Sequence, residues 1–225
     1  MTKHIILLTL AGLLTFACAG RAQYTLELTG VGDGAVSDGV YISPYQGVIN
    51  QGGKQIFSGY MICDDFADES YLKDPWTATA TNAGALNGTE MFTTSNTSYT
   101  VQQNYDAVAW LANQLLLPGN VTNPTTQTDI SFAIWDIMDG QTTNPDGGTP
   151  TWIANAFNEV VSDNYVGTNV TVYTPNPNGG PGHSPSQEFL VVTTPEASTP
   201  ILFAIDLLGF VALVGFLRKR QARAY

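Results

Sequence analysis

The stretch DISFAIWDIM, residues 129–138, decides the fold class at the centre of this 225-residue chain. Its apolar residues recur at intervals of three and four, which places them on one face of a helix. They are Ile130, Ala133, Ile134, Ile137 and Met138. Because Gly140 follows, and glycine commonly ends helices, we predict an amphipathic helix that stops before it.

Two neighbouring segments share this helical periodicity. The upstream segment ends at Pro118-Gly119 and carries Tyr105, Val108, Ala109, Ala112 and Leu116 on one face. The downstream segment begins at Thr149-Pro150, a capping residue followed by the residue favoured at the first helical position. Its apolar residues are Ile153, Ala156, Phe157 and Val160. The pattern predicts three amphipathic surface helices that close on a core.

Strand-like segments lie on both sides of this helical block. They cover residues 24–28, 40–42 and 55–63 before it, and 170–173 and 189–192 after it. Residues 77–100 are rich in Thr, Asn, Ser and Gly, which indicates exposed loops or edge strands with a polar face. We therefore predict one α+β domain over residues 23–194, β-rich and sandwich-like or barrel-like, with a central block of about three helices.

The first 22 residues have the three parts of a secretory signal peptide. A basic start containing Lys3 is followed by an apolar run over residues 5–17 and by small residues suited to cleavage, up to Ala22. Cleavage there would remove Cys18 and leave Cys63 as the single cysteine of the mature chain. An internal disulfide is then impossible, and the domain is expected outside the cytoplasm.

The opposite end predicts a membrane helix. Residues 201–217 are apolar except for Asp206, and as a helix they would span about 25 Å. A basic tail over residues 218–225 begins with Arg218, Lys219 and Arg220. Since basic clusters stay on the cytoplasmic side, this orientation also leaves residues 23–194 outside the cytoplasm.

The box before this helix, residues 195–199, completes a recognisable three-part order. Its residues are Pro195, Glu196, Ala197, Ser198 and Thr199. Residues 195–225 resemble a PEP-CTERM sorting signal, with Ala197 where that family usually has its second proline. The resemblance implies an exosortase-like processing enzyme as partner, transient anchoring in the inner membrane, and a final place in the cell envelope, at the cell surface or in an extracellular biofilm matrix.

The chain is strongly acidic, with a formal net charge of −11. Between residues 23 and 195, two lysines, Lys54 and Lys73, stand against seventeen acidic residues, which argues against nucleic acid as a partner. A cluster of four acids is a candidate calcium site: Asp64, Asp65, Asp68 and Glu69. A solvated acidic loop is the alternative.

Other ligand sites have weaker signals. His183 would be the single histidine of the exported chain, so neither a Ser-His-Asp triad nor a zinc site is predicted, and we assign no catalytic residue. Several aromatic residues could line a carbohydrate platform, although core packing is the commoner use: Tyr41, Tyr45, Trp76, Trp110, Trp135 and Trp152. Of these, we expect Trp76 to lie on a loop.

A second resemblance concerns two central segments. GYMICDD, residues 59–65, and FAIWD, residues 132–136, are similar to the two halves of secreted Cys-Gln thioester domains. In that family a strand cysteine and a helix glutamine condense into a thioester that captures an amine or hydroxyl on a target surface. Alignment on the second segment puts Ser131 at the glutamine position. Gln127, the other candidate partner for Cys63, lies one helical turn earlier, about 6 Å away along the axis.

These observations leave three hypotheses for function. The leading one is a non-catalytic exported protein of the cell surface or extracellular matrix, sorted by an exosortase-like system, with extracellular polysaccharide as a possible partner. The first alternative is a thioester-type covalent adhesin. The second is a secreted hydrolase of polysaccharides, for which no spacing of acidic residues singles out a catalytic pair.

Overall fold

The computed structural model describes residues 23–32, 36–37, 39–140, 147–176 and 186–193. The predicted signal peptide and sorting tail lie outside these residues, and so does His183. Within the part of the chain that is described, no helix is both long and apolar enough to cross a membrane.

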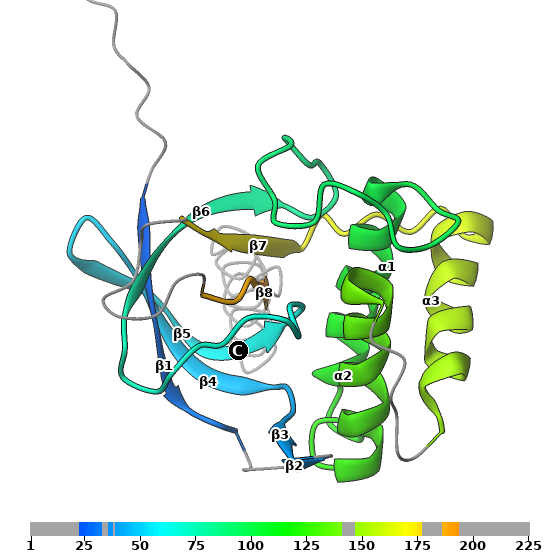
Figure 1. Ribbon diagram of the computed structural model, residues 1–225, viewed down its shortest axis with the longest axis horizontal. Helices are drawn as coiled ribbons and strands as arrows, with labels where there is room; N and C mark the ends of the chain where they lie inside the picture. The colour runs from blue at the N-terminus through cyan, green and yellow to red at the C-terminus, as the bar shows by residue number, and fades with distance from the viewer. Residues whose placement is uncertain (1–22, 33–35, 38, 141–146, 177–185, 194–225) are drawn as a thin grey trace, which may run out of the picture.

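Six antiparallel strands close into a barrel, and three helices cover one side of it (Figure 1). The order around the barrel is β1-β4-β5-β8-β7-β6, and β2 and β3 form a separate two-stranded sheet. The strands are β1 (Tyr24–Gly30), β2 (Val36–Ser37), β3 (Val40–Tyr41), β4 (Tyr45–Gln51), β5 (Lys54–Cys63), β6 (Trp76–Asn82), β7 (Val170–Pro175) and β8 (Phe189–Val192); the helices are α1 (Val101–Leu115), α2 (Pro124–Asp139) and α3 (Thr149–Ser162). The predicted α+β class with three central helices is confirmed.

Two barrel strands differ from the sequence prediction. Strand β4 was not predicted from the sequence. It is joined to β5 by Gly52 and Gly53, whose φ angles of 58° and 79° suit a two-residue hairpin turn. Strand β6 falls partly in the stretch predicted as loop or edge strand, yet it pairs with β1 and β7. Because the barrel is closed, β6 has no free edge. The loop position expected for Trp76 is wrong, because Trp76 is the first residue of β6 and its side chain is 2% exposed.

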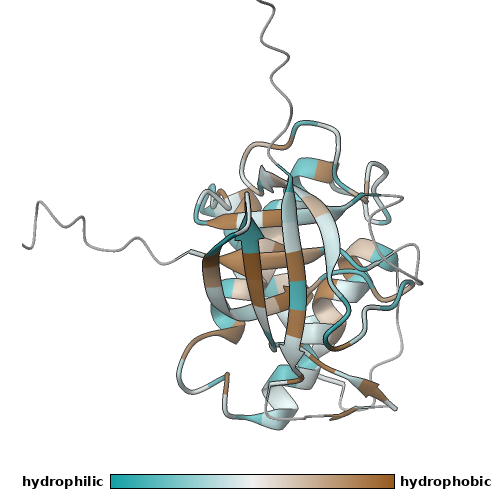
Figure 2. Ribbon diagram, turned by 90° about the vertical axis from the view of Figure 1, so that its left-hand side faces the viewer, coloured by the Kyte–Doolittle hydropathy of each residue, from teal (hydrophilic) through white to brown (hydrophobic). Residues whose placement is uncertain are grey.

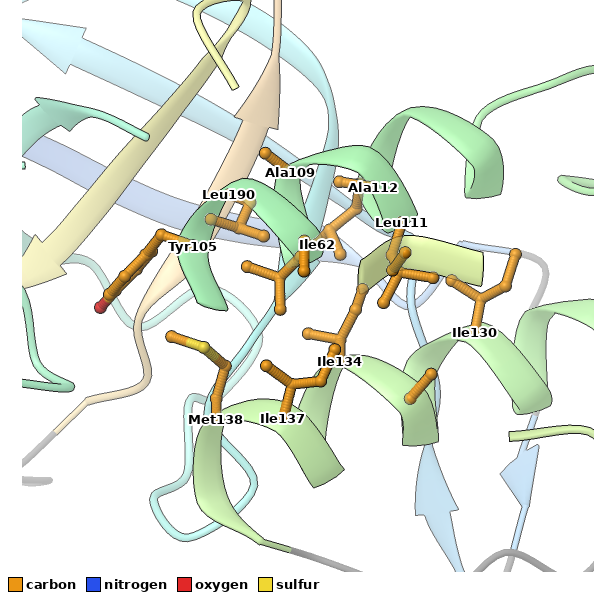
Figure 3. Close-up of a cluster of buried hydrophobic side chains, with 14 of the residues drawn as sticks. Ile62, Tyr105, Ala109, Leu111, Ala112, Ile130, Ile134, Ile137, Met138 and Leu190 are labelled. Atoms are coloured by element: carbon orange, nitrogen blue, oxygen red, sulfur yellow. The ribbon is translucent and has the colours of Figure 1, made fainter. Parts of the chain in front are cut away.

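The core has two layers because alternate residues of each strand face opposite sides. One layer fills the barrel and includes Leu26, Ile49, Met61, Trp76 and Phe189. The other lies between the barrel wall and the helices, where Ile62 and Leu190 pack against α1 and α2 (Figure 3). The same alternation of polar and apolar residues is visible along the strands on the barrel side (Figure 2).

The helix boundaries follow local capping. Thr100 caps α1 through a reciprocal capping box with Gln103, and Asn123 caps α2. The predicted end of α2 is confirmed, because Gly140 takes a left-handed conformation with φ 71°. Helices α1 and α2 are buried over most of their circumference, since each contacts the other two helices and α1 also contacts β8. The three predicted helices are confirmed, but only α3 lies at the surface as predicted, because α1 and α2 are more deeply buried.

The start of α3 departs from the predicted cap. Gly148, not Thr149, occupies the cap position, and Thr149 is the first helical residue. Asp129 of α2 explains the difference: its Oδ1 accepts the Gly148 N–H at 3.0 Å, and its carbonyl oxygen accepts the Thr149 hydroxyl at 3.2 Å. Thr149 thus joins α3 to α2 instead of capping its own helix.

Candidate functional site

Cys63 lies at the end of β5 and is fully buried in the barrel interior. Its thiol donates to the Asp65 carbonyl oxygen at 3.0 Å, and its carbonyl oxygen accepts the Trp135 indole N–H at 3.1 Å. Burial, followed by the nearby charges of Asp65 and Asp64, raises the pKa of the Cys63 thiol well above its usual value. The thiol is therefore protonated and shielded.

The two candidate partners of Cys63 occupy different places on α2. Ser131 is fully buried, and its Oγ accepts the Ser43 N–H at 3.1 Å; the Ser43 Oγ in turn accepts the Cys63 N–H at 3.0 Å. Ser131 and Cys63 thus share one intervening residue. The Gln127 carboxamide instead donates to the Val121 carbonyl oxygen in the turn before α2. Of the two candidates, the one linked to Cys63 through Ser43 is therefore a serine, which cannot condense with a cysteine to the amide-derived thioester.

Glu188, immediately before β8, was not singled out by the sequence. Its fully buried carboxylate accepts hydrogen bonds from the Tyr105 hydroxyl at 2.5 Å, the Met91 N–H at 2.9 Å and the Thr174 hydroxyl. A charged residue directly before the apolar run of residues 189–192 is the signal that could have indicated a buried, hydrogen-bonded acid.

Asp64 is the fourth neighbour of this carboxylate. The pKa of Asp64 is raised well above its usual value, first by burial and then by the charge of Glu188. Neither Asp64 carboxyl oxygen accepts a hydrogen bond from the residues that the structure describes. A protonated Asp64 can donate its own O–H to Glu188, so the two acids are stable as a pair that holds one proton.

The four acids of the predicted calcium cluster are divided among different environments. Asp64 belongs to the buried pair, whereas Asp65 accepts the Ala67 and Asp68 N–H groups at 3.0 and 3.2 Å and closes a turn. Glu69 accepts the Tyr71 hydroxyl. Among the described residues, no three His, Cys, Asp or Glu side chains gather as a metal site requires. These residues do not fit a calcium ion.

A pocket of about 390 Å³ lies beside this acidic segment. It is lined by the end of the β2–β3 hairpin, by residues of β1 and β4, by Trp135 of α2, and by the loop that follows β5. Its aromatic lining residues are Tyr41, Tyr45, Phe66, Tyr71 and Trp135. Tyr45 and Trp135 are buried, whereas Tyr41 and Tyr71 are 51% and 43% exposed. The pocket thus combines a buried aromatic base with accessible aromatic rings.

The loop that lines the pocket is held by hydrogen bonds on both sides of Tyr71. Lys73 N donates to the Leu28 carbonyl oxygen of β1 at 2.9 Å. Gln187 N donates to Ser70 Oγ at 3.1 Å, while Ser70 N donates to Gln187 Oε1 at 3.2 Å. The pocket is therefore a preformed feature of the fold. Tyr71 was not singled out by the sequence, because only the contact of its loop with β1 brings it to the pocket.

The sequence matches no protein-family model and no curated protein. Solved structures similar to the chain include the following two. The N-terminal domain of the Streptococcus pyogenes pilus tip adhesin Cpa has 10% sequence identity and a TM-score of 0.42, covering 79% of this chain and 97% of that one. The N-terminal thioester domain of a protein F2 like fibronectin-binding protein from Streptococcus pneumoniae has 10% identity and a TM-score of 0.41, covering 77% and 94%.

Proposed function

We propose that this chain is an exported, non-catalytic protein of the cell surface or extracellular matrix that binds polysaccharide. One observation carries the proposal: exposed Tyr41 and Tyr71, from two separate segments, line a single preformed pocket with a buried aromatic base. Flat aromatic faces suit the apolar C–H faces of sugar rings, while the nearby carboxylates and amides can accept or donate hydrogen bonds to hydroxyl groups.

Affinity for polysaccharide tests this proposal. We expect Tyr41→Ala and Tyr71→Ala each to weaken binding at least about tenfold, the equivalent of 1.4 kcal/mol. The Tyr41 substitution keeps the backbone carbonyl that accepts the Tyr45 hydroxyl, so the fold of the hairpin should be preserved. Tyr60→Ala, on β5 and outside the pocket lining, is the matched control and should bind as the parent chain does. Unchanged affinity in both pocket variants would contradict the proposal.

Export and sorting form the second part of the proposal. They rest on the sequence of the two ends, residues 1–22 and 195–225. The intact mass of protein purified from its own host should correspond to a chain that lacks both the signal peptide and the segment after the Pro195 box. Recovery of residues 201–217 in the mature protein would refute processing by an exosortase-like enzyme.

The thioester-type adhesin is the main alternative, and Cys63 distinguishes it. Exposure to methylamine would add the amine to a reactive thioester, and the adduct would disappear in Cys63→Ala. Because the Gln127 carboxamide is hydrogen-bonded to the Val121 carbonyl oxygen, and Ser131 is the candidate linked to Cys63 through Ser43, we expect no adduct. The hydrolase alternative is tested by turnover of an oligosaccharide panel, where we expect binding without cleavage.

A further inference from the structure

The charges of the pocket have a single sign. Its charged lining residues are Asp68 and Glu69, and no Lys, Arg or His belongs to the described lining. An acidic polysaccharide would meet repulsion here, whereas a cationic ligand would be attracted.

Carboxylate and aromatic groups occupy the same wall of the pocket. The Tyr71 hydroxyl donates to Glu69 Oε2, which holds a carboxylate beside an exposed ring. Aromatic faces attract organic ammonium groups but offer nothing to a strongly hydrated metal ion, which requires several oxygen ligands. The absence of a three-acid group among the described residues agrees with an organic cation in place of a metal.

We infer that the pocket selects polysaccharides that carry free amino groups, such as polymers of de-N-acetylated hexosamine. Their ammonium groups would pair with Asp68 and Glu69, while the sugar rings contact Tyr41 and Tyr71. This inference rests on the proposed function and specifies its ligand. It accounts together for the aromatic rings, the carboxylates and the lack of a cationic side chain in the described lining.

Calorimetric titration of the processed chain with two oligosaccharides of equal length tests the inference. One is an oligomer of glucosamine and the other its N-acetylated form, both at a slightly acidic pH that keeps the amines protonated. We expect the glucosamine oligomer to bind about tenfold more tightly or better, with a preference that declines as salt is added. Equal affinity for the two would overturn the ammonium inference and leave the polysaccharide-binding proposal standing; binding of neither would overturn both.

Substitutions of the pocket carboxylates test whether Asp68 and Glu69 cause the preference for glucosamine. In the double variant Asp68→Asn with Glu69→Gln, the preference for glucosamine should disappear while affinity for the N-acetylated oligomer is retained. The glutamine can still accept the Tyr71 hydroxyl, so the wall should keep its shape. Glu27→Gln, on β1 and outside the pocket lining, should keep the full preference. A lysine oligomer supplies the same ammonium groups without sugar rings, and tighter binding to it than to glucosamine would overturn the assignment to a polysaccharide.

Discussion

Glu188 connects four parts of the chain through one side chain. Its donors come from α1, from β7 and from the loop before α1, and its neighbour Asp64, whose pKa burial raises, follows β5. Two hydroxyl groups and one backbone amide therefore stabilise this carboxylate, where many buried carboxylates are paired with a cation.

Replacement of Glu188 should destabilise the fold more than its size suggests. In Glu188→Ala the Tyr105, Thr174 and Met91 donors lose their acceptor, and each unsatisfied buried group costs roughly 1–3 kcal/mol, so we expect a loss of about 3 kcal/mol or more. Urea denaturation would measure it. Glu27→Ala, a partly exposed glutamate on β1, is the control and should change the unfolding free energy by less than about 1 kcal/mol. Equal losses in the two variants would show that the hydrogen bonds contribute nothing.

Cys63 should be chemically silent in the native protein. It is 0% exposed and its pKa is raised by burial, so both access and thiolate formation are restricted. We expect alkylation by iodoacetamide to be very slow in buffer and complete in denaturant, as followed by intact mass. Rapid alkylation without denaturant would mean that the barrel opens near the end of β5.

The elements of the helical block are joined where small residues allow close approach. A Cβ at Gly167, just before β7, would lie 2.6 Å from the Cβ of Ala109 in α1 and 3.2 Å from that of Ala83. The Gly167 N–H also donates to the buried Asp106 Oδ1 at 2.8 Å. The contact between α1 and the start of β7 therefore depends on the absence of a side chain at this position.

Gly167→Ala should consequently weaken this contact. The added methyl group meets backbone-fixed Cβ atoms that cannot rotate away, and overpacking of this kind costs typically about 1–3 kcal/mol. Thermal unfolding followed by circular dichroism would report a lower midpoint. Gly119→Ala, with nothing within 4 Å of the new methyl group, serves as control and should leave the midpoint nearly unchanged. An unchanged thermal midpoint in Gly167→Ala would indicate that α1 can shift to make room for the added methyl group.

The helices could be predicted from the sequence more completely than the strands. The helices were predictable because their apolar periodicity and the residues that end them, such as Pro118-Gly119 and Gly140, lie within the segment itself. Strand β6 and the cap of α3 were not, since β6 is defined by partners in β1 and β7, and the cap by Asp129. The candidate site was partly foreseen, with Tyr41, Tyr45 and Trp135 among the aromatic candidates, but the hydrogen bonds that position Tyr71 join residues distant in sequence.

At the scale of the whole molecule, the acidic charge is distributed unevenly between surface and interior. The chain has a formal net charge of −11, and several of its carboxyls lie where water is excluded. Burial, as the largest cause, raises the pKa of Asp65 to about 7 and that of Asp64 and Glu188 above their usual values. Protonation relieves the repulsion within the net charge and removes the cost of burying ionised acids. Both effects favour the folded state when protons are abundant.

Stability should accordingly fall as pH rises. Below about pH 4 both the folded and the unfolded chain hold the Asp65 proton. Between about pH 4 and 7 the unfolded chain releases this proton while the folded chain keeps it, so the unfolding free energy declines over this window. The loss is complete above the folded-state pKa of about 7. Asp64 extends the decline to higher pH. We expect a lower thermal midpoint at pH 8 than at pH 5. Asp65→Asn, which retains a side-chain acceptor for the Ala67 and Asp68 N–H groups, should flatten the profile between pH 4 and 7, whereas Asp163→Asn at the exposed end of α3 should not. A midpoint that rises with pH would mean that these carboxyls are ionised in the folded chain and stabilised by partners other than a shared proton.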